Sequence, residues 1–182
     1  MLHRYDIPSD PKTHEGWAVI LLDTHGLFFA AVSDYGNYAY MWTDIGHGNE
    51  FRKFLAGLEP DYLYGKLMSG RPDIKVYDGD LTKVAIRDAI EEMNKAEREV
   101  TGKDWTYYKR ELEFLEEDFD TRLDFERWSE STELASSWEL AKYVPEPQCT
   151  QFCTKTFALF KQRLTEELRV ESGYGLKPPV EP

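Results

Sequence analysis

The stretch SDYGNYAYMW, from Ser33 to Trp42, decides the fold class of this 182-residue chain. It follows an apolar run, LFFAAV, and is centred on the dipeptide Gly36-Asn37. Both residues of this dipeptide tolerate a positive φ angle, as a two-residue type I′ hairpin turn requires. Beyond the dipeptide, aromatic and non-aromatic residues alternate, which places the rings of Tyr38, Tyr40 and Trp42 on one face of a strand. The stretch therefore predicts a β-hairpin.

A second strand-like run, WAVILLD, comes before this hairpin and is followed by turn-forming residues, Asp23 to Gly26. Three strands joined by two short turns predict an antiparallel meander over residues 16–45. Pro8 and Pro11 exclude a regular helix near the start of the chain, so we expect residues 1–15 to form an arm.

Apolar residues recur at helical spacing after the meander. The clearest stripe is expected on one helix near residues 103–123 and consists of Trp105, Tyr108, Leu112, Leu115 and Phe119. Strands first and helices after favour an α+β fold, with a three-stranded antiparallel meander and four to six helices packed on one face of the sheet. We expect a single domain over 16–171, with the sheet at 16–45 and the helical part at 49–171. Residues 172–182, rich in Gly and Pro, are expected to form a flexible tail.

The composition narrows the class of protein. The formal net charge is −12, so phosphate backbones repel the chain and direct nucleic-acid binding is not expected. No apolar run approaches the roughly 20 residues that span a bilayer, and the polar N-terminus lacks a secretory signal. The two cysteines, Cys149 and Cys153, are too few for a disulfide framework. These features indicate a cytoplasmic protein without membrane partners.

No complete catalytic motif is present. The four histidines form no HExxH motif, and neither a GxSxG elbow nor a phosphate-binding loop occurs. We therefore expect no metal, no cofactor and no catalytic residue, and an enzyme is the less favoured class.

The aromatic hairpin has two interpretations. Aromatic residues on one face suit a half-buried sheet, and this structural interpretation is favoured. In the alternative, the rings stack on a flat ligand beside polar residues at the strand ends. The residues of that alternative site are Asp34, Tyr35, Tyr38, Tyr40, Trp42, Asp44 and His47.

An acidic segment provides the other candidate site. Residues 111–126 hold eight carboxylates against one arginine. The expected helix turns several of them away from its apolar stripe, and we interpret them either as a solvated face or as a docking surface for a basic groove. A two-metal nuclease site is a weaker interpretation, because a convex helix face offers no pocket. The docking residues would be Glu113, Glu116, Glu117, Asp120 and Asp124.

Two segments carry a resemblance to a known family. DTHGLFFAAVSDYGNYAYMW (23–42) followed by FRKFLAGLEPDYLYGKL (51–67) resembles the start of small accessory proteins encoded by phages and prophages. FERWSESTELASSWELAKY (125–143) resembles their C-terminal portion more weakly. The resemblance carries over no catalytic residue. It implies a mobile-element protein, and such accessory genes often encode small acidic inhibitors of host defence.

These observations favour a small acidic interaction protein that inhibits a host anti-phage protein in the bacterial cytoplasm. Its partner would present a basic surface, as a nucleic-acid-binding effector does, and the carboxylates would stand in for phosphates. The alternative is a small-molecule-binding protein or a hydrolytic enzyme that uses the strand-end residues. The stripe over 103–123 would serve equally in the protomer core or in a homodimer interface.

Overall fold

The structure of the chain is a computed structural model that describes residues 1–46, 50–72, 74–115 and 119–173. The chain forms two compact units. The sheet unit comprises Met1–Ile74 and Glu146–Pro182, and the helical unit comprises Lys75–Pro145. Each unit has a hydrophobic core of its own, whereas the sequence pattern predicted one domain over 16–171.

The sheet unit contains four antiparallel strands in the order β1 (Leu2–Ile7), β2 (Ala18–Asp23), β3 (Phe28–Ser33) and β4 (Gly36–Met41). This confirms the α+β class and adds one strand to the predicted meander. The additional strand, β1, lies in residues that were expected to form an arm. The prolines that excluded a regular helix there come after the strand ends, and Tyr5 pairs with Ile20 in the ladder.

The turn between β3 and β4 lies two residues before the predicted position. Ser33 pairs with Gly36, so the two-residue turn is Asp34-Tyr35 and not Gly36-Asn37. Gly36 does have a positive φ angle, +110°, but Asn37 does not. Local hydrogen bonds explain the shift, because the Tyr38 hydroxyl donates to the Tyr35 carbonyl and the Ser33 hydroxyl donates to the Gly36 carbonyl.

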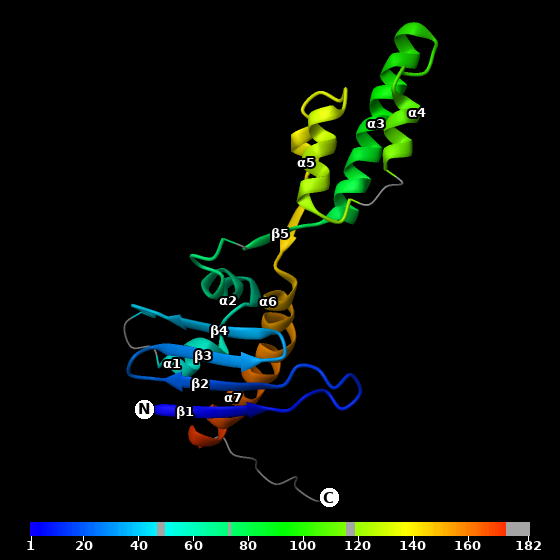
Figure 1. Cartoon of the computed structure of the whole chain (residues 1–182). Coiled ribbons are helices and arrows are strands. Elements are labelled where there is room, and N and C mark those ends of the chain that lie inside the picture. The colour runs from blue at the N-terminus through cyan, green and yellow to red at the C-terminus, as the bar shows by residue number, and fades with distance from the viewer. Residues whose placement is uncertain (47–49, 73, 116–118, 174–182) are drawn as a thin grey trace, which may run out of the picture. The chain divides into compact units, whose positions relative to one another are not determined.

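The helices of the sheet unit cover one face of the sheet, as Figure 1 shows. They are α1 (Phe51–Ala56), α2 (Pro60–Leu67), α6 (Pro147–Gln151), a π-helical turn (Phe152–Thr156) and α7 (Phe157–Glu171). The ring of Phe29 on β3 makes edge contacts with Phe152, Phe157 and Phe160. Such aromatic pairs bury large apolar areas in specific geometry, and they hold the sheet to α7.

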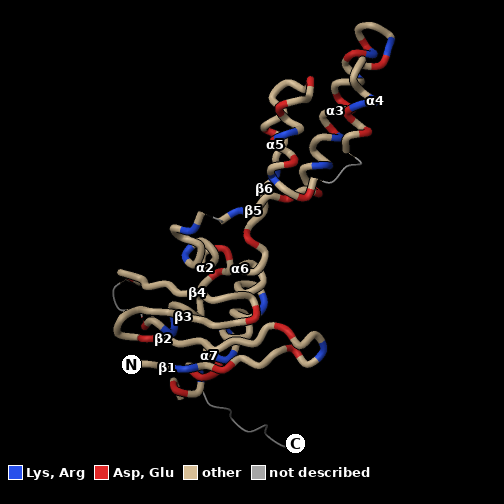
Figure 2. Tube along the Cα trace, viewed as in Figure 1, with Lys and Arg blue, Asp and Glu red and all other residues tan. Residues whose placement is uncertain are grey.

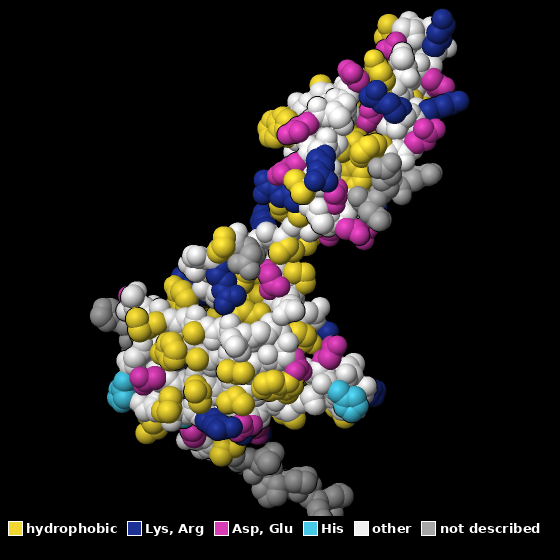
Figure 3. Space-filling view, in the orientation of Figure 1, with side chains coloured by type: hydrophobic (Ala, Val, Ile, Leu, Met, Phe, Trp, Pro, Cys, Tyr) yellow, Lys and Arg dark blue, Asp and Glu magenta, His cyan; other side chains and the backbone are white. Residues whose placement is uncertain are grey.

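The opposite face of the sheet carries apolar side chains that the helices do not cover. Phe28, Val32 and Met41 are exposed there, and Figure 3 shows hydrophobic side chains scattered over the sheet. Charged residues mark its β1 edge, where Arg4 and Asp6 pair at 2.8 Å.

The helical unit begins and ends with two paired strands, β5 (Lys75–Tyr77) and β6 (Tyr143–Pro145). Between them lie α3 (Gly79–Thr101), α4 (Tyr108–Phe114), α5 (Arg122–Ser131) and a short 3-10 helix (Ser137–Leu140). The core of this unit consists of Ile86, Ile90, Leu115, Phe119, Phe125, Trp128 and Leu134.

The prediction of a single helix near 103–123 is wrong. The structure has the short helix α4 and, from Arg122, the separate helix α5. Thr121 starts α5 with a capping box, in which its hydroxyl accepts the Asp124 N–H and the Asp124 carboxylate accepts the Thr121 N–H. A capping box satisfies the free N–H groups of a new helix start, so the chain begins a second helix here. Leu115 and Phe119 of the predicted stripe are nonetheless buried.

One tyrosine holds together the two chain segments of the sheet unit that flank residues 75–145. The Tyr64 hydroxyl accepts a hydrogen bond from the Glu146 N–H at 2.7 Å. The same hydroxyl donates to the Ile74 carbonyl. Segments that are far apart in the sequence are thereby joined at one side chain of α2.

Candidate interaction surface of the helical unit

Negative charge is unevenly divided between the two units. By sequence, residues 75–145 hold 19 Asp and Glu against 11 Lys and Arg, whereas the rest of the chain holds 15 against 11. Figure 2 shows acidic residues along the helices of the helical unit, with basic residues between them. The carboxylates in excess over the cations are therefore concentrated in this unit.

The predicted docking residues do not share one helix face. Glu113 lies exposed on α4, and Asp120 lies exposed just before α5. Neither has an ion-pair partner among the described residues. Glu116 and Glu117 lie outside the described residues.

Asp124 helps to cap the start of α5. Its carboxylate accepts the N–H of Thr121 at 3.2 Å and lies 3.9 Å from Arg127. The hydrogen bond from the Thr121 side chain is the largest cause of a lowered pKa of Asp124. A carboxylate at the first turn of a helix also interacts favourably with the helix dipole. Asp124 therefore stabilises the start of α5 whether or not a partner binds nearby.

Glu111 was not singled out in the sequence analysis, and it is the most buried of the segment's described carboxylates, with 3% of its surface exposed. Its Oε2 accepts hydrogen bonds from Trp128 Nε1 at 3.0 Å and Thr132 Oγ1 at 2.9 Å. Its Oε1 accepts one from Arg110 at 2.7 Å. Helical spacing could have identified it, because position 111 lies four residues before the buried Leu115 and on the same side.

A cavity of about 240 Å³ opens beside this carboxylate. Its lining residues are Arg110, Glu111, Phe114, Trp128 and Ser131. They come from α4 and α5, so the break between these helices creates the cavity. A continuous helix would have carried its polar residues on a convex surface.

Arg110 interacts with the charges of two carboxylates. Its guanidinium bonds to Glu111 and lies 4.5 Å from the ring centre of Tyr107. The hydrogen bond to Glu111 is the largest cause of a raised pKa of Arg110, and the charge of Glu133 contributes. Glu133 is exposed and has no ion pair within 4 Å among the described residues. The two carboxylates outnumber the one guanidinium, so the local charge stays negative.

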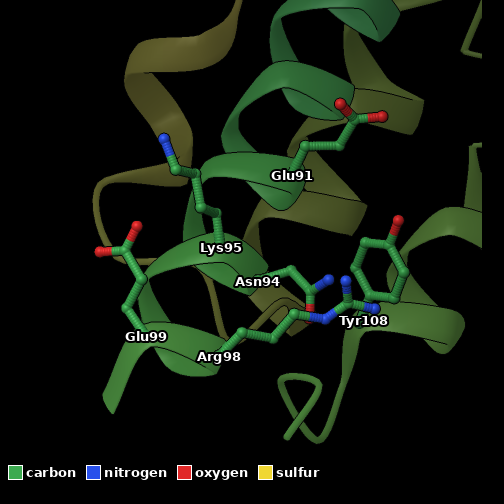
Figure 4. Close-up of a pocket in the computed structure, with 6 residues that line it drawn as sticks. All are labelled: Glu91, Asn94, Lys95, Arg98, Glu99 and Tyr108. Carbon is green, nitrogen blue, oxygen red and sulfur yellow. The ribbon is translucent and has the colours of Figure 1, made fainter. Parts of the chain in front are cut away.

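A larger cavity, of about 480 Å³, lies between α3 and α4 and is lined by Glu91, Asn94, Lys95, Arg98, Glu99 and Tyr108. Figure 4 shows Asn94, Arg98 and Tyr108 turned toward one another, while Lys95 and Glu99 extend away. Arg98 pairs with Asp104, and the amide oxygen of Asn94 accepts the Trp105 N–H at 2.8 Å. The acidic and basic side chains that line this cavity balance in charge. Arg98 and Asn94 are already bonded to other residues of the helical unit.

The aromatic hairpin contributes mainly to the core of the sheet unit. Tyr38 and Trp42 are buried. The Tyr38 ring lies 4.8 Å from the ring of Phe152, and the Trp42 ring 5.6 Å from that of Phe51. Tyr40 is half-buried and faces the ammonium group of Lys66.

The polar residues of the alternative site lie in turns. Asp34 accepts the Trp17 N–H at 3.3 Å, and Asp44 accepts the Gly46 N–H at 2.7 Å. Tyr35 lines a cavity of about 270 Å³. His47 lies outside the described residues.

The described part of the chain contains no group of three or more His, Cys, Asp or Glu that could hold a metal ion. Cys149 and Cys153 are free thiols and both are buried. Among the described helices, none combines the length and the apolar character that a membrane span requires.

The fold and these surfaces define an acidic α+β protein whose helical unit carries most of the excess negative charge. Comparison with known families gives its origin: residues 3–166 match the family described as "Phage family". The chain belongs to this phage protein family, which confirms the resemblance noted in its sequence. No curated protein and no solved structure matches the chain.

Proposed function

We propose that this phage protein is a non-enzymatic interaction protein that inhibits a host defence protein in the bacterial cytoplasm. The helical unit docks on a basic surface of that protein. The observation that carries the proposal is the excess of carboxylates in residues 75–145, including Glu113 and Asp120, which are exposed and form no ion pair with another described residue.

Charge of this kind acts chiefly on association. A patch of one sign attracts an opposite surface over about one Debye length, about 10 Å at 0.1 M salt. It accelerates encounter and rejects partners of the same sign. A nucleic-acid-binding effector fits this description, because its surface is already built to attract phosphates. The carboxylates would occupy the places of those phosphates.

The test compares two variants with equal loss of negative charge. In the helical variant, Glu113, Glu116 and Glu117 become Gln and Asp120 becomes Asn. In the control variant, four acidic residues of the sheet unit are neutralised in the same way: Glu50, Glu59, Asp61 and Glu166. Each chain is used to capture partners from a bacterial lysate at low and high salt. Each is also tested for protecting a phage in a host that carries a defence system.

We expect one partner to be captured at low salt by the wild-type and control chains and to be lost at high salt. The helical variant should bind it at least about tenfold more weakly, mainly through slower association. Phage protection should fall in parallel. If the helical variant captures the partner and protects the phage as well as the control variant does, the proposed docking surface is wrong.

A further inference from the structure

We infer that the cavity between α4 and α5 binds an arginine side chain of the partner, whose guanidinium pairs with Glu111. In the free protein, Arg110 pairs with this carboxylate. The inference rests on the proposed function, because it names the group on a basic partner that the helical unit recognises.

The carboxylate of Glu111 is held in place to accept a hydrogen bond from a cation. Trp128 and Thr132 hold its Oε2 with two hydrogen bonds. The hydrogen bond recorded for its Oε1 comes from Arg110, whose side chain is 54% exposed. Because one oxygen is fixed from inside the core, the other can exchange its partner without moving the carboxylate.

The charge around the cavity favours a second cation. A buried carboxylate without a cation is costly, which explains why Arg110 covers it in the free protein. The charge of Glu133 also acts on Arg110, and Glu133 has no ion pair with any residue that the structure describes. An incoming arginine could therefore take Glu111 while Arg110 turns to Glu133, and both carboxylates would then be paired.

The walls of the cavity favour arginine over lysine. Phe114 and Trp128 are aromatic, and a planar guanidinium stacks on aromatic faces while it pairs with a carboxylate. A lysine ammonium is more strongly hydrated and lacks the planar fork. At about 240 Å³, the cavity is below the roughly 300 Å³ at which pockets for drug-sized ligands begin. It suits a single side chain.

Arg110 competes with the partner's arginine for Glu111, so removing the Arg110 side chain provides the test. The probe is a capped Gly-Arg-Gly peptide, and the comparison probe is capped Gly-Lys-Gly. Both are titrated into the folded full-length chain while the indole N–H signals are followed by NMR. Arg110→Ala is compared with Arg127→Ala, which removes another exposed arginine from the helical unit, one that lies 3.9 Å from Asp124.

We expect Arg110→Ala to bind the arginine peptide about tenfold more tightly than the wild-type chain does. Without Arg110, the Glu111 carboxylate is free to form a charge-assisted pair with the peptide. The Trp128 indole signal should move, and the lysine peptide should bind at least about threefold more weakly. Arg127→Ala should behave like the wild type. Adding Glu111→Gln to Arg110→Ala should abolish the gain. If the double variant does not fold, adding Thr132→Val, which removes only one donor to Glu111, should reduce the gain instead.

The inference is overturned if Arg110→Ala binds no more tightly than Arg127→Ala, if the two peptides bind equally, or if the Trp128 signal does not move. These outcomes are separable from failure of the proposed function. Loss of the partner in the helical variant, with no effect of Arg110→Ala on the peptide, leaves the docking proposal intact and refutes the arginine cavity. If Arg110→Ala binds the peptide tightly but the helical variant loses no partner, the arginine cavity stands and the docking proposal is refuted.

Discussion

Trp128 on α5 donates its indole N–H to the carboxylate of Glu111 on α4, at 3.0 Å, across 17 residues of chain. Both side chains are almost fully buried. The bond joins the polar wall of the cavity to the core of the helical unit, because the same indole also packs against Phe119 and Phe125.

Trp128→Phe should lower the free energy of unfolding by about 1–3 kcal/mol. The ring contacts are largely kept, but a buried carboxylate loses one donor. Chemical denaturation measures the change. Trp138→Phe is the matched control, because Trp138 is 69% exposed and should change stability by less than about 0.5 kcal/mol. Equal effects of the two substitutions would contradict the buried hydrogen bond.

Gly36→Ala should destabilise the protein by about 1–2 kcal/mol, because an L-residue at φ +110° is strained. Its Cβ would also lie 3.2 Å from the Tyr38 hydroxyl, which bonds to the turn. Thermal unfolding measures the loss. Gly65→Ala, within α2 and with no neighbouring atom near its added Cβ, should be neutral or stabilise by up to about 1 kcal/mol. A neutral Gly36→Ala would argue against this turn.

Asp124 should make stability depend on acid. Its pKa is lowered in the folded protein, first by the hydrogen bond from Thr121. A lowered folded pKa means that the stabilising contribution is present above the unfolded pKa, near 4. It is lost as the pH falls through the folded value. Melting temperatures between pH 7 and pH 2 should therefore fall less steeply in Asp124→Asn than in the wild type. Parallel wild-type and Asp124→Asn profiles would contradict this role.

The two thiols should be unreactive in the folded protein. Cys149 and Cys153 have 0% and 1% of their surfaces exposed. Their mutual hydrogen bond raises the pKa of Cys153 and lowers the pKa of Cys149, so burial, which keeps a reagent away from both sulfurs, is what protects them. A thiol-specific chromogenic reagent should therefore label neither residue under native conditions and both in denaturant. Cys149→Ser should halve the signal in denaturant. Rapid labelling of the native chain would show that this part of the core opens readily.

The sheet could be predicted because alternation with a period of two is a strong local signal. The aromatic face of the hairpin does turn toward the helices, and Tyr38 and Trp42 on that face are buried. Strand β1 was missed because two prolines after it were taken to affect the whole segment. The turn was misplaced because Gly-Asn is a stronger local signal than Asp-Tyr, and the deciding contact, from Tyr38 to Tyr35, appears only when the strand pairs.

The candidate site was harder to predict, because it depends on where a helix stops. Apolar spacing continues across residues 105–119, so periodicity alone extends one helix through the break. The capping box at Thr121 and Asp124 has the sequence pattern of a helix start, and it was outweighed by the stripe. Once α4 and α5 are separate, Glu111 bonds to Trp128, and a carboxylate that the sequence analysis did not single out is buried.

The hydroxyl of Tyr64 touches both Ile74 and Glu146, and Lys75 pairs with Pro145 directly beyond them. The helical unit is therefore inserted into the sequence of the sheet unit, and the two ends of the insertion are held close together in space. Such an insertion can be lengthened, exchanged or removed by recombination while the four-stranded ladder and its helices keep all their own residues. This architecture would allow the acidic part to be exchanged on an unchanged scaffold.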